Sequence, residues 1–233
     1  MNPQTLSPSS ETTLDEAVLA LYSRVRALEA KDAIRDVLFR YCRAVDRGDA
    51  ELMKSCYHPD ARDDHGFYSG SGWDFVDYVL PILAQLECSI HTLANPLIEL
   101  KGTRALVETQ WSVIHRLRRG SRLTDIWDQG RYLDEFEWRD GHWKILNRVV
   151  VMDGERWMDT VNLLNLVPRN NPNRVHTGER STRDPVYRLQ ELGSLVRTDF
   201  RLPDLWSAYR KLLPLPKRLL GWLGYRIQSR SAF

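Results

Sequence analysis

Three polar residues stand where the surrounding pattern calls for apolar side chains. Asp46 closes a helical pattern, and His91 lies inside a segment of β-type composition. Arg148 lies between Leu146 and Val150, which are its same-face neighbours in a strand of period two. We therefore expect all three side chains to point into one concave interior.

The chemistry of these residue types favours proton transfer. A carboxylate at a helix C-terminus is disfavoured by roughly 0.3–1 kcal/mol, and a partner that donates to Asp46 would offset this cost. If that partner is His91, the carboxylate fixes the imidazole tautomer and leaves the other ring nitrogen as a general base. Tyr41 and Arg148 would then stabilise an oxygen that gains charge. The sequence contains no nucleophilic Ser or Cys motif, so elimination fits better than acyl transfer.

Each residue also has a structural interpretation. His91 suits an ordinary hydrogen-bonded strand residue, and Asp46 suits a residue that helps to cap the helix after Asp49. Arg148 suits a cross-strand ion pair with Glu108 or Asp134. Spacing alone leaves both interpretations open.

The elements that must position these residues begin with helices. Residues 13–46 carry apolar side chains at helical spacing, as one long helix or two. Gly48 is placed to end this region, and Asp49 can cap a short helix from Ala50 to about Cys56. "YHPDARDD" reads as a turn. Ser71 is the expected N-cap of a helix with Phe75, Val79 and Ile82 inward.

After Glu87 the pattern changes to β-type alternation, and Asp140-Gly141 joins two strands as a hairpin. Helices followed by an antiparallel meander predict the α+β class, with helices on one face of a curved antiparallel sheet.

Composition limits the alternatives. The 233 residues are 42% hydrophobic and carry a net charge of only +2, so the totals predict a packed core and no nucleic-acid partner. Three cysteines without metal-type spacing indicate a reducing compartment. There is no signal-like start and no apolar run near the roughly 18 residues that a membrane span needs. We expect a cytoplasmic protein.

Three stretches carry a family resemblance: "YCRAVDRGDAELMKSCYHPDA", "HTLANPLIEL" and a final W-K-I-x-x-R strand. Together with "RSTRDPVY", they resemble the SnoaL-like branch of the NTF2-like superfamily over roughly residues 25–160. The resemblance implies a cone-shaped α+β barrel around a pocket. It implies a SnoaL-like domain over 13–165, after a disordered arm at 1–12 and before a C-terminal loop and basic extension at 166–233.

The resemblance also implies an activity. Lyases of this branch, such as scytalone dehydratase and bile-acid 7α-dehydratase, need no cofactor and use an Asp–His dyad, often with Tyr and Arg. By position the dyad falls on Asp46 and His91, the Tyr on Tyr41 and the Arg on Arg148. A homotrimer is also expected. The predicted function is dehydration of a bulky aromatic or polycyclic molecule in aromatic compound catabolism. Related outcomes are isomerisation and a retro-aldol cleavage that releases formaldehyde. The alternative is a non-catalytic ligand-binding or assembly subunit, like the small subunit of ring-hydroxylating dioxygenases.

Further residues are candidates for the wall of a hydrophobic pocket. They are His65, Tyr68, Tyr57, Trp111 and Trp127, with Asp128, Glu108 and His115 as weaker candidates. Trp111 and Trp127 serve equally well as plain core residues. His58, Asp60, Asp63, Asp64 and His65 are close in sequence, but solvent-facing carboxylates in a turn explain them better than a metal site, and we predict none.

The tail from Ser194 has 8 Lys/Arg against 2 Asp/Glu. Its basic, amphipathic composition suits a membrane surface or packing on a neighbouring subunit or the pocket mouth. Prolines interrupt it, so we favour packing.

Overall fold

The protein was analysed as a computed structural model that describes residues 14–162 and 176–191. The first region is a single helix, α1 (Leu14–Arg47), and not two. Gly48 follows it with a φ of +68°, a conformation that costs glycine little. The side chain of Asp49 accepts from the amide of Leu52 and caps α2 (Ala50–Ser55), as predicted.

The stretch expected to be a turn is a strand, which corrects the sequence prediction. β1 (Tyr57–Asp64) pairs with β2 (Ser69–Ser71) on one side and with β6 on the other. Turn-forming residues are overridden here because the strand pairs with β6, and Ala61 and Asp63 are buried at alternate positions within it.

The next helix, α3 (Gly72–Leu83), begins where predicted. The Ser71 hydroxyl accepts from the amide of Asp74 and caps it. Phe75 and Val79 are buried, but Ile82 is 47% exposed, so the expectation that it points inward was wrong.

Four long strands form the predicted meander. They are β3 (Cys88–Lys101), β4 (Arg104–Arg119), β5 (Arg122–Arg139) and β6 (His142–Thr160). Asp140 and Gly141 both have positive φ, which confirms the predicted hairpin between β5 and β6.

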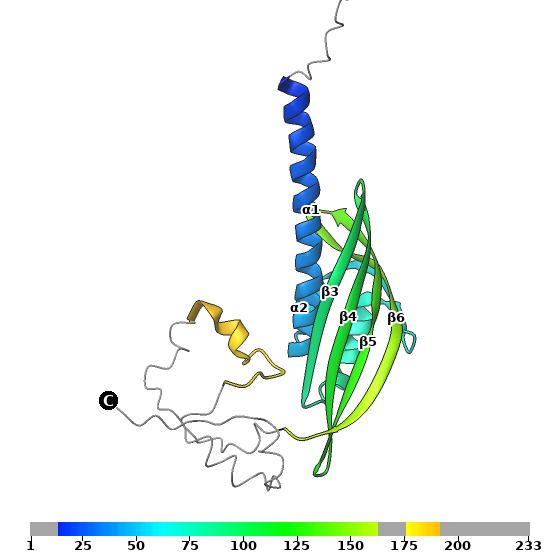
Figure 1. Cartoon of the computed structure of the whole chain (residues 1–233), viewed down its shortest axis with the longest axis vertical. Helices are drawn as coiled ribbons and strands as arrows, with labels where there is room; N and C mark the ends of the chain where they lie inside the picture. The colour runs from blue at the N-terminus through cyan, green and yellow to red at the C-terminus, as the bar shows by residue number, and fades with distance from the viewer. Residues whose placement is uncertain (1–13, 163–175, 192–233) are drawn as a thin grey trace, which may run out of the picture. The chain divides into compact units, whose positions relative to one another are not determined.

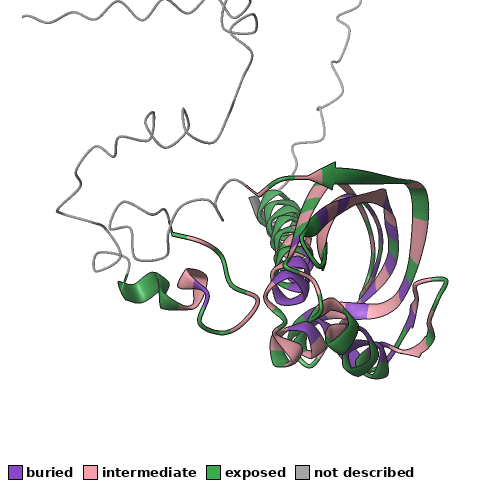
Figure 2. Cartoon of the chain, turned by 90° about the horizontal axis from the view of Figure 1, so that it is seen from below, coloured by how far each residue is buried: buried purple, intermediate pink, exposed green. Residues whose placement is uncertain are grey.

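These strands form one curved sheet in the order β2-β1-β6-β5-β4-β3. Only the β1–β6 pairing is parallel, so the sheet is mixed and not wholly antiparallel. Figure 2 shows it bending around the helices, with buried residues on the helices and on the strands. The predicted α+β cone is confirmed, with the edges of the sheet left unjoined.

Irregularities along β5 help to bend the sheet. The register between β5 and β6 shifts at Gln129/Gly130 and at Glu135/Phe136. A Cβ on Gly130 would lie 1.9 Å from the carbonyl oxygen of Val151 and 2.8 Å from the Trp111 ring. Only glycine allows this close approach, which brings Trp111 and β6 together beside the concave face.

The hydrophobic core lies between the C-terminal half of α1, helix α3 and the concave face. Ile34, Val37 and Leu38 are at most 1% exposed, and they pack with Phe136 and Ile145 from the sheet. The N-terminal turns of α1 run past the ends of the strands (Figure 1).

Residues 177–190 belong to the same compact unit as the preceding domain. They include most of a 3-10 helix, η2 (Pro185–Glu191). The arm at 1–12 and the basic tail from Ser194 lie outside the described residues. Among those that are described, no helix is long and apolar enough to cross a membrane.

Candidate active site

A cavity of about 380 Å³ opens between the helices and the concave face of the sheet. Helix residues Tyr41, Val45 and Phe75 form one side, and strand residues including Trp111 and Tyr132 form the other. The volume is near the lower end of the roughly 300–1,000 Å³ that small-molecule pockets occupy. The rings and aliphatic groups in its wall suit a compact, flat, hydrophobic ligand.

Asp46 and His91 are in contact at one side of this cavity. The last full turn of α1 carries Asp46, and β3 carries His91, whose Nδ1 lies 2.6 Å from Asp46 Oδ1. The same carboxylate accepts from the Ser89 hydroxyl at 3.0 Å and from the His91 amide at 2.9 Å. An aspartate carboxylate accepts hydrogen bonds, so the His91 nitrogen that contacts it is the donor. Nδ1 then carries the proton, and Nε2 is the ring nitrogen left for the cavity.

Arg180 binds the C-terminal end of the helix that carries Asp46. Its guanidinium donates to the carbonyl oxygens of Val45 and Asp46, both at 3.2 Å. A cation on the last carbonyls of a helix offsets the negative end of the helix dipole. This contact therefore lowers the electrostatic cost of placing the Asp46 carboxylate at the C-terminus of α1.

The strands beside His91 carry polar groups that the protein itself does not satisfy. Within the described part of the chain, His115 Nδ1, Asp128 Oδ1 and Trp111 Nε1 are buried without a hydrogen-bond partner. Burial and nearby His91 lower the pKa of His115 to about 4, so its imidazole is neutral near pH 7. Burial and the Glu155 carboxylate raise the pKa of Asp128. Unmet groups in a pocket wall are the expected complement of a ligand with polar substituents.

A second imidazole is also held by a carboxylate. His65 Nδ1 contacts Asp63, which accepts from the Tyr57 hydroxyl at 2.5 Å as well. The His65 ring stacks on Phe75 with centroids 3.9 Å apart, and both rings line the cavity. The cavity thus contains two carboxylate-held imidazoles, on β3 and just after β1.

The SnoaL-like domain family matches residues 26–149, which include both Asp46 and His91. The chain belongs to the SnoaL-like family. This confirms the family resemblance found in the sequence. No functionally curated protein matches the chain at a significant level.

Solved structures share the fold of this SnoaL-like domain at low sequence identity. A hexachlorocyclohexane dehydrochlorinase, LinA type 2, is 18% identical over 64% of this chain and 99% of that chain, with a TM-score of 0.55. A candidate scytalone dehydratase from Novosphingobium aromaticivorans is 22% identical over 56% of this chain and 88% of that chain, with a TM-score of 0.51. Kfla4162 from Kribbella flavida is 13% identical over 56% and 95%, with a TM-score of 0.52.

Arg148 does not reach the cavity of the SnoaL-like domain. Its Nε and one terminal nitrogen donate to Asp134 at 2.7 and 2.8 Å, and both side chains are fully buried. The guanidinium carbon lies 4.2 and 4.0 Å from the ring centroids of Tyr41 and Tyr132. The cross-strand ion pair with Asp134, one of the structural alternatives, is the arrangement observed.

The other predicted wall residues divide into two groups. His65 and Trp111 line the cavity, but Tyr57, Tyr68 and Trp127 are not among its lining residues. Tyr57 is fully buried behind the wall, Tyr68 packs on Phe75, and the Trp127 indole donates to Ser112. Of the described residues, no group of three or more His, Cys, Asp or Glu is arranged to hold a metal ion.

The sequence favoured His115 and Asp128 only as weaker pocket candidates, considered Asp63 only for a metal site, and did not point to Arg180. Arg180 lies in "RSTRDPVY", so the motif that carried the resemblance also contained the missing residue. The other three follow from strand register, which no local pattern revealed.

Proposed function

We propose that this SnoaL-like domain is a lyase of the dehydratase type, acting on a hydrophobic aromatic or compact polycyclic molecule. The single observation that carries the proposal is the Asp46–His91 contact, which consumes one ring nitrogen and leaves the other for the cavity. A carboxylate-held imidazole is a suitable general base near neutral pH.

An acid on the same face of the sheet, two strands from His91, would complete the reaction. His91, Val113, Asp128 and Glu155 are paired in turn across β3, β4, β5 and β6, so their side chains share the concave face. With strands about 4.8 Å apart, His91 and Asp128 are separated by about 10 Å at the backbone, which leaves room for a flat ring between them. The raised pKa of Asp128 favours the protonated form that an acid needs.

In the proposed step, His91 Nε2 takes a proton from a substrate carbon. The C–H electron pair forms the new double bond, the C–O bond breaks, and the departing oxygen takes a proton from Asp128 and leaves as water. His91 then releases its proton to solvent, and Asp128 regains one. Burial raises the pKa of Tyr41, so its neutral hydroxyl would donate to an oxygen that gains charge. Arg148 would act only through the Tyr41 ring.

The first test is a screen of the purified full-length protein against aromatic and polycyclic alcohols, with mass detection of the products. Loss of water supports the dehydratase. Loss of formaldehyde would mean that the same base deprotonates a hydroxyl and cleaves a C–C bond. Saturable binding without turnover would support the non-catalytic alternative and overturn the lyase.

The two imidazoles provide a matched comparison once a substrate is found. We expect His91→Gln to lower kcat by about 10²–10⁴-fold, the usual contribution of a general base. His65→Gln should act mainly on KM because its ring is stacked in the wall. The reverse result would assign the base to His65.

Asp128→Asn tests whether Asp128 is the general acid or only a residue of the cavity wall. The asparagine keeps the size and a hydrogen-bonding group but has no proton to give. We expect a fall in kcat and loss of the alkaline limb of the pH–rate profile, with the acidic limb from the base retained. An unchanged alkaline limb would exclude Asp128 as the acid. The cytoplasmic location and the catabolic role stay predictions, and the homotrimer expected from the resemblance is one of the outcomes that the sedimentation experiment below tests.

A further inference from the structure

The N-terminal half of α1 exposes a stripe of apolar side chains. Val18, Leu21, Val25 and Leu28, which we call the α1 stripe, are 55%, 59%, 41% and 67% exposed. This part of the helix runs beyond the ends of the strands (Figure 1). A row of large aliphatic groups in water indicates an interaction surface.

The spacing of the α1 stripe is that of a coiled coil. Its members follow one another at intervals of three, four and three residues, which places valine at positions a and leucine at positions d of a heptad. β-branched residues at a with leucine at d favour two parallel strands. The next position a is Asp32, which ends the apolar stripe.

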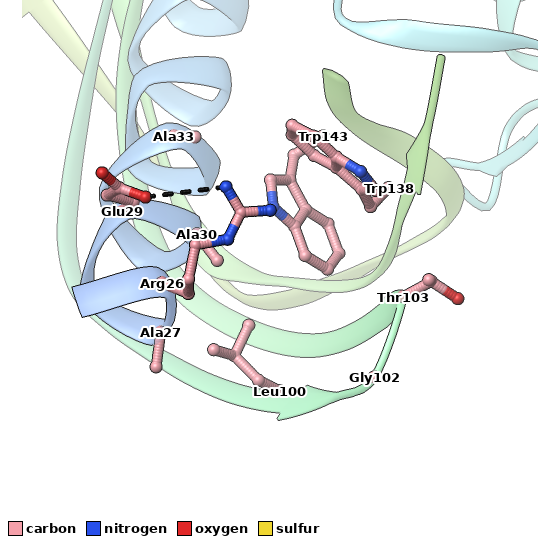
Figure 3. Close-up of a pocket in the computed structure, with 10 residues that line it drawn as sticks. All are labelled: Arg26, Ala27, Glu29, Ala30, Ala33, Leu100, Gly102, Thr103, Trp138 and Trp143. Carbon is pink, nitrogen blue, oxygen red and sulfur yellow. Dashed lines mark ion pairs between the residues drawn. The ribbon is translucent and has the colours of Figure 1, made fainter. Parts of the chain in front are cut away.

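The stripe faces away from the domain to which α1 belongs. In Figure 3, Arg26, Ala30 and Ala33 of α1 lie toward a hollow that Leu100, Trp138 and Trp143 also line. At roughly 100° per residue, the four stripe residues lie about 160–240° around the helix from Ala30. The domain therefore covers the other side of α1 and leaves room for a second helix on the stripe.

The charged residues beside the stripe select the partner and its direction. Arg24 and Lys31 occupy positions g, and Glu29 and Asp36 occupy positions e. In a parallel pair each g residue meets the e residue five positions later on the other chain, which joins Arg24 to Glu29 and Lys31 to Asp36. An antiparallel pair would bring the positive residues together and the negative residues together.

We propose that the α1 stripe binds the same stripe of a second copy of this chain as a short, parallel, two-stranded coiled coil. The helix thereby joins two SnoaL-like domains at one end. The occupant is a second copy because the apolar pattern and both charge pairs are self-complementary.

The decisive experiment measures the mass of the full-length protein by sedimentation equilibrium over a range of concentrations. We expect twice the 27.2 kDa chain mass for the unmodified protein. The variant Leu21→Glu/Leu28→Glu should weaken association by about tenfold or more, because it buries carboxylates at two positions d. Both side chains are more than half exposed in the single chain, so circular dichroism should show unchanged folding.

A matched control and a charge exchange test the geometry. Leu19→Glu introduces the same change at a residue that is 65% exposed but lies outside positions a and d, and it should leave the mass unchanged. Arg24→Glu should weaken the dimer, and Arg24→Glu/Glu29→Arg should restore it.

Three outcomes would overturn the proposal: an unmodified protein that sediments as a single chain, an assembly that survives Leu21→Glu/Leu28→Glu, or a charge exchange that restores nothing. A mass of three chains that is insensitive to the stripe would favour the homotrimer expected from the resemblance. The readout is independent of catalysis, so it stands whether or not the domain is a lyase.

Discussion

Two pairs of a carboxylate with a nitrogen-bearing side chain lie in the same domain, and their surroundings differ. Asp134 and Arg148 make two hydrogen bonds to each other, are fully buried, and sit between the rings of Tyr41 and Tyr132. Asp46 and His91 make one side-chain bond, with their side chains 9% and 7% exposed, and His91 lines the cavity.

The difference teaches that burial and pairing alone do not mark a catalytic group. In the sealed pair of Asp134 and Arg148 the charges face each other, and the one guanidinium nitrogen without a partner, Nη1, is buried away from the cavity. The Asp46–His91 pair keeps one ring nitrogen available and faces a wall with unsatisfied polar atoms. Removing the first pair should therefore affect folding, and altering the second should affect chemistry.

The largest expected effect is that of Asp46→Asn on the cavity pair. An amide offers one acceptor oxygen to three donors, so the His91 tautomer is no longer held. We expect kcat to fall by about 10³-fold with a small change in unfolding free energy, as for other oriented imidazoles. Long-range ¹H–¹⁵N spectra of the His91 ring would check the tautomer without any substrate. Full activity with the Nδ1–H tautomer retained would reject the dyad.

For the sealed pair, Arg148→Met should lower the free energy of unfolding by about 3–5 kcal/mol, because it leaves Asp134 buried and unpaired. Urea denaturation measures this loss. The double variant Arg148→Met/Asp134→Leu should recover most of the stability. If activity, and not stability, were the quantity lost in Arg148→Met, the guanidinium would have a direct role at the cavity.

His115 should make the cavity wall sensitive to acid. Its folded pKa of about 4 lies below its ordinary 6.5, so below pH 6.5 the unfolded chain takes up a proton that the folded chain refuses. Stability is then full above pH 6.5 and is lost as the pH falls to 4, by up to about 3 kcal/mol at roughly 1.4 kcal/mol per pH unit. His115→Gln should remove this part of the acid dependence, whereas the exposed control His142→Gln should not. Denaturation midpoints between pH 4 and 7 would show it.

The smallest effect on stability is expected from Arg180, which binds the end of the helix beside Asp46. Arg180→Gln removes a cation from the carbonyls of Val45 and Asp46 and should cost about 1–2 kcal/mol in unfolding free energy. Arg183→Gln, with an 82% exposed side chain, is the matched control and should be neutral. Equal losses in both variants would mean that Arg180 does not support Asp46 specifically.

Local patterns were sufficient for much of the fold. Gly48, Asp49, Ser71 and the Asp140-Gly141 pair end or begin elements where predicted, because capping and tight turns depend on a few adjacent residues. β1 was missed because its turn-forming residues are held extended by β6, a strand about 90 residues later in the chain. Such pairing has no local signal.

The sequence by itself determined the residue types of the candidate site and the α+β arrangement that brings Asp46 and His91 together, since helical and strand periods fix which face each side chain takes. Only the tertiary structure decided which polar residues face the cavity. Arg148 and His91 occupy similar patterns in their strands. Arg148 is paired with Asp134 in the buried core, whereas His91 is paired with Asp46 and lines the cavity. That choice depends on strand register and sheet curvature, which arise from contacts between distant segments.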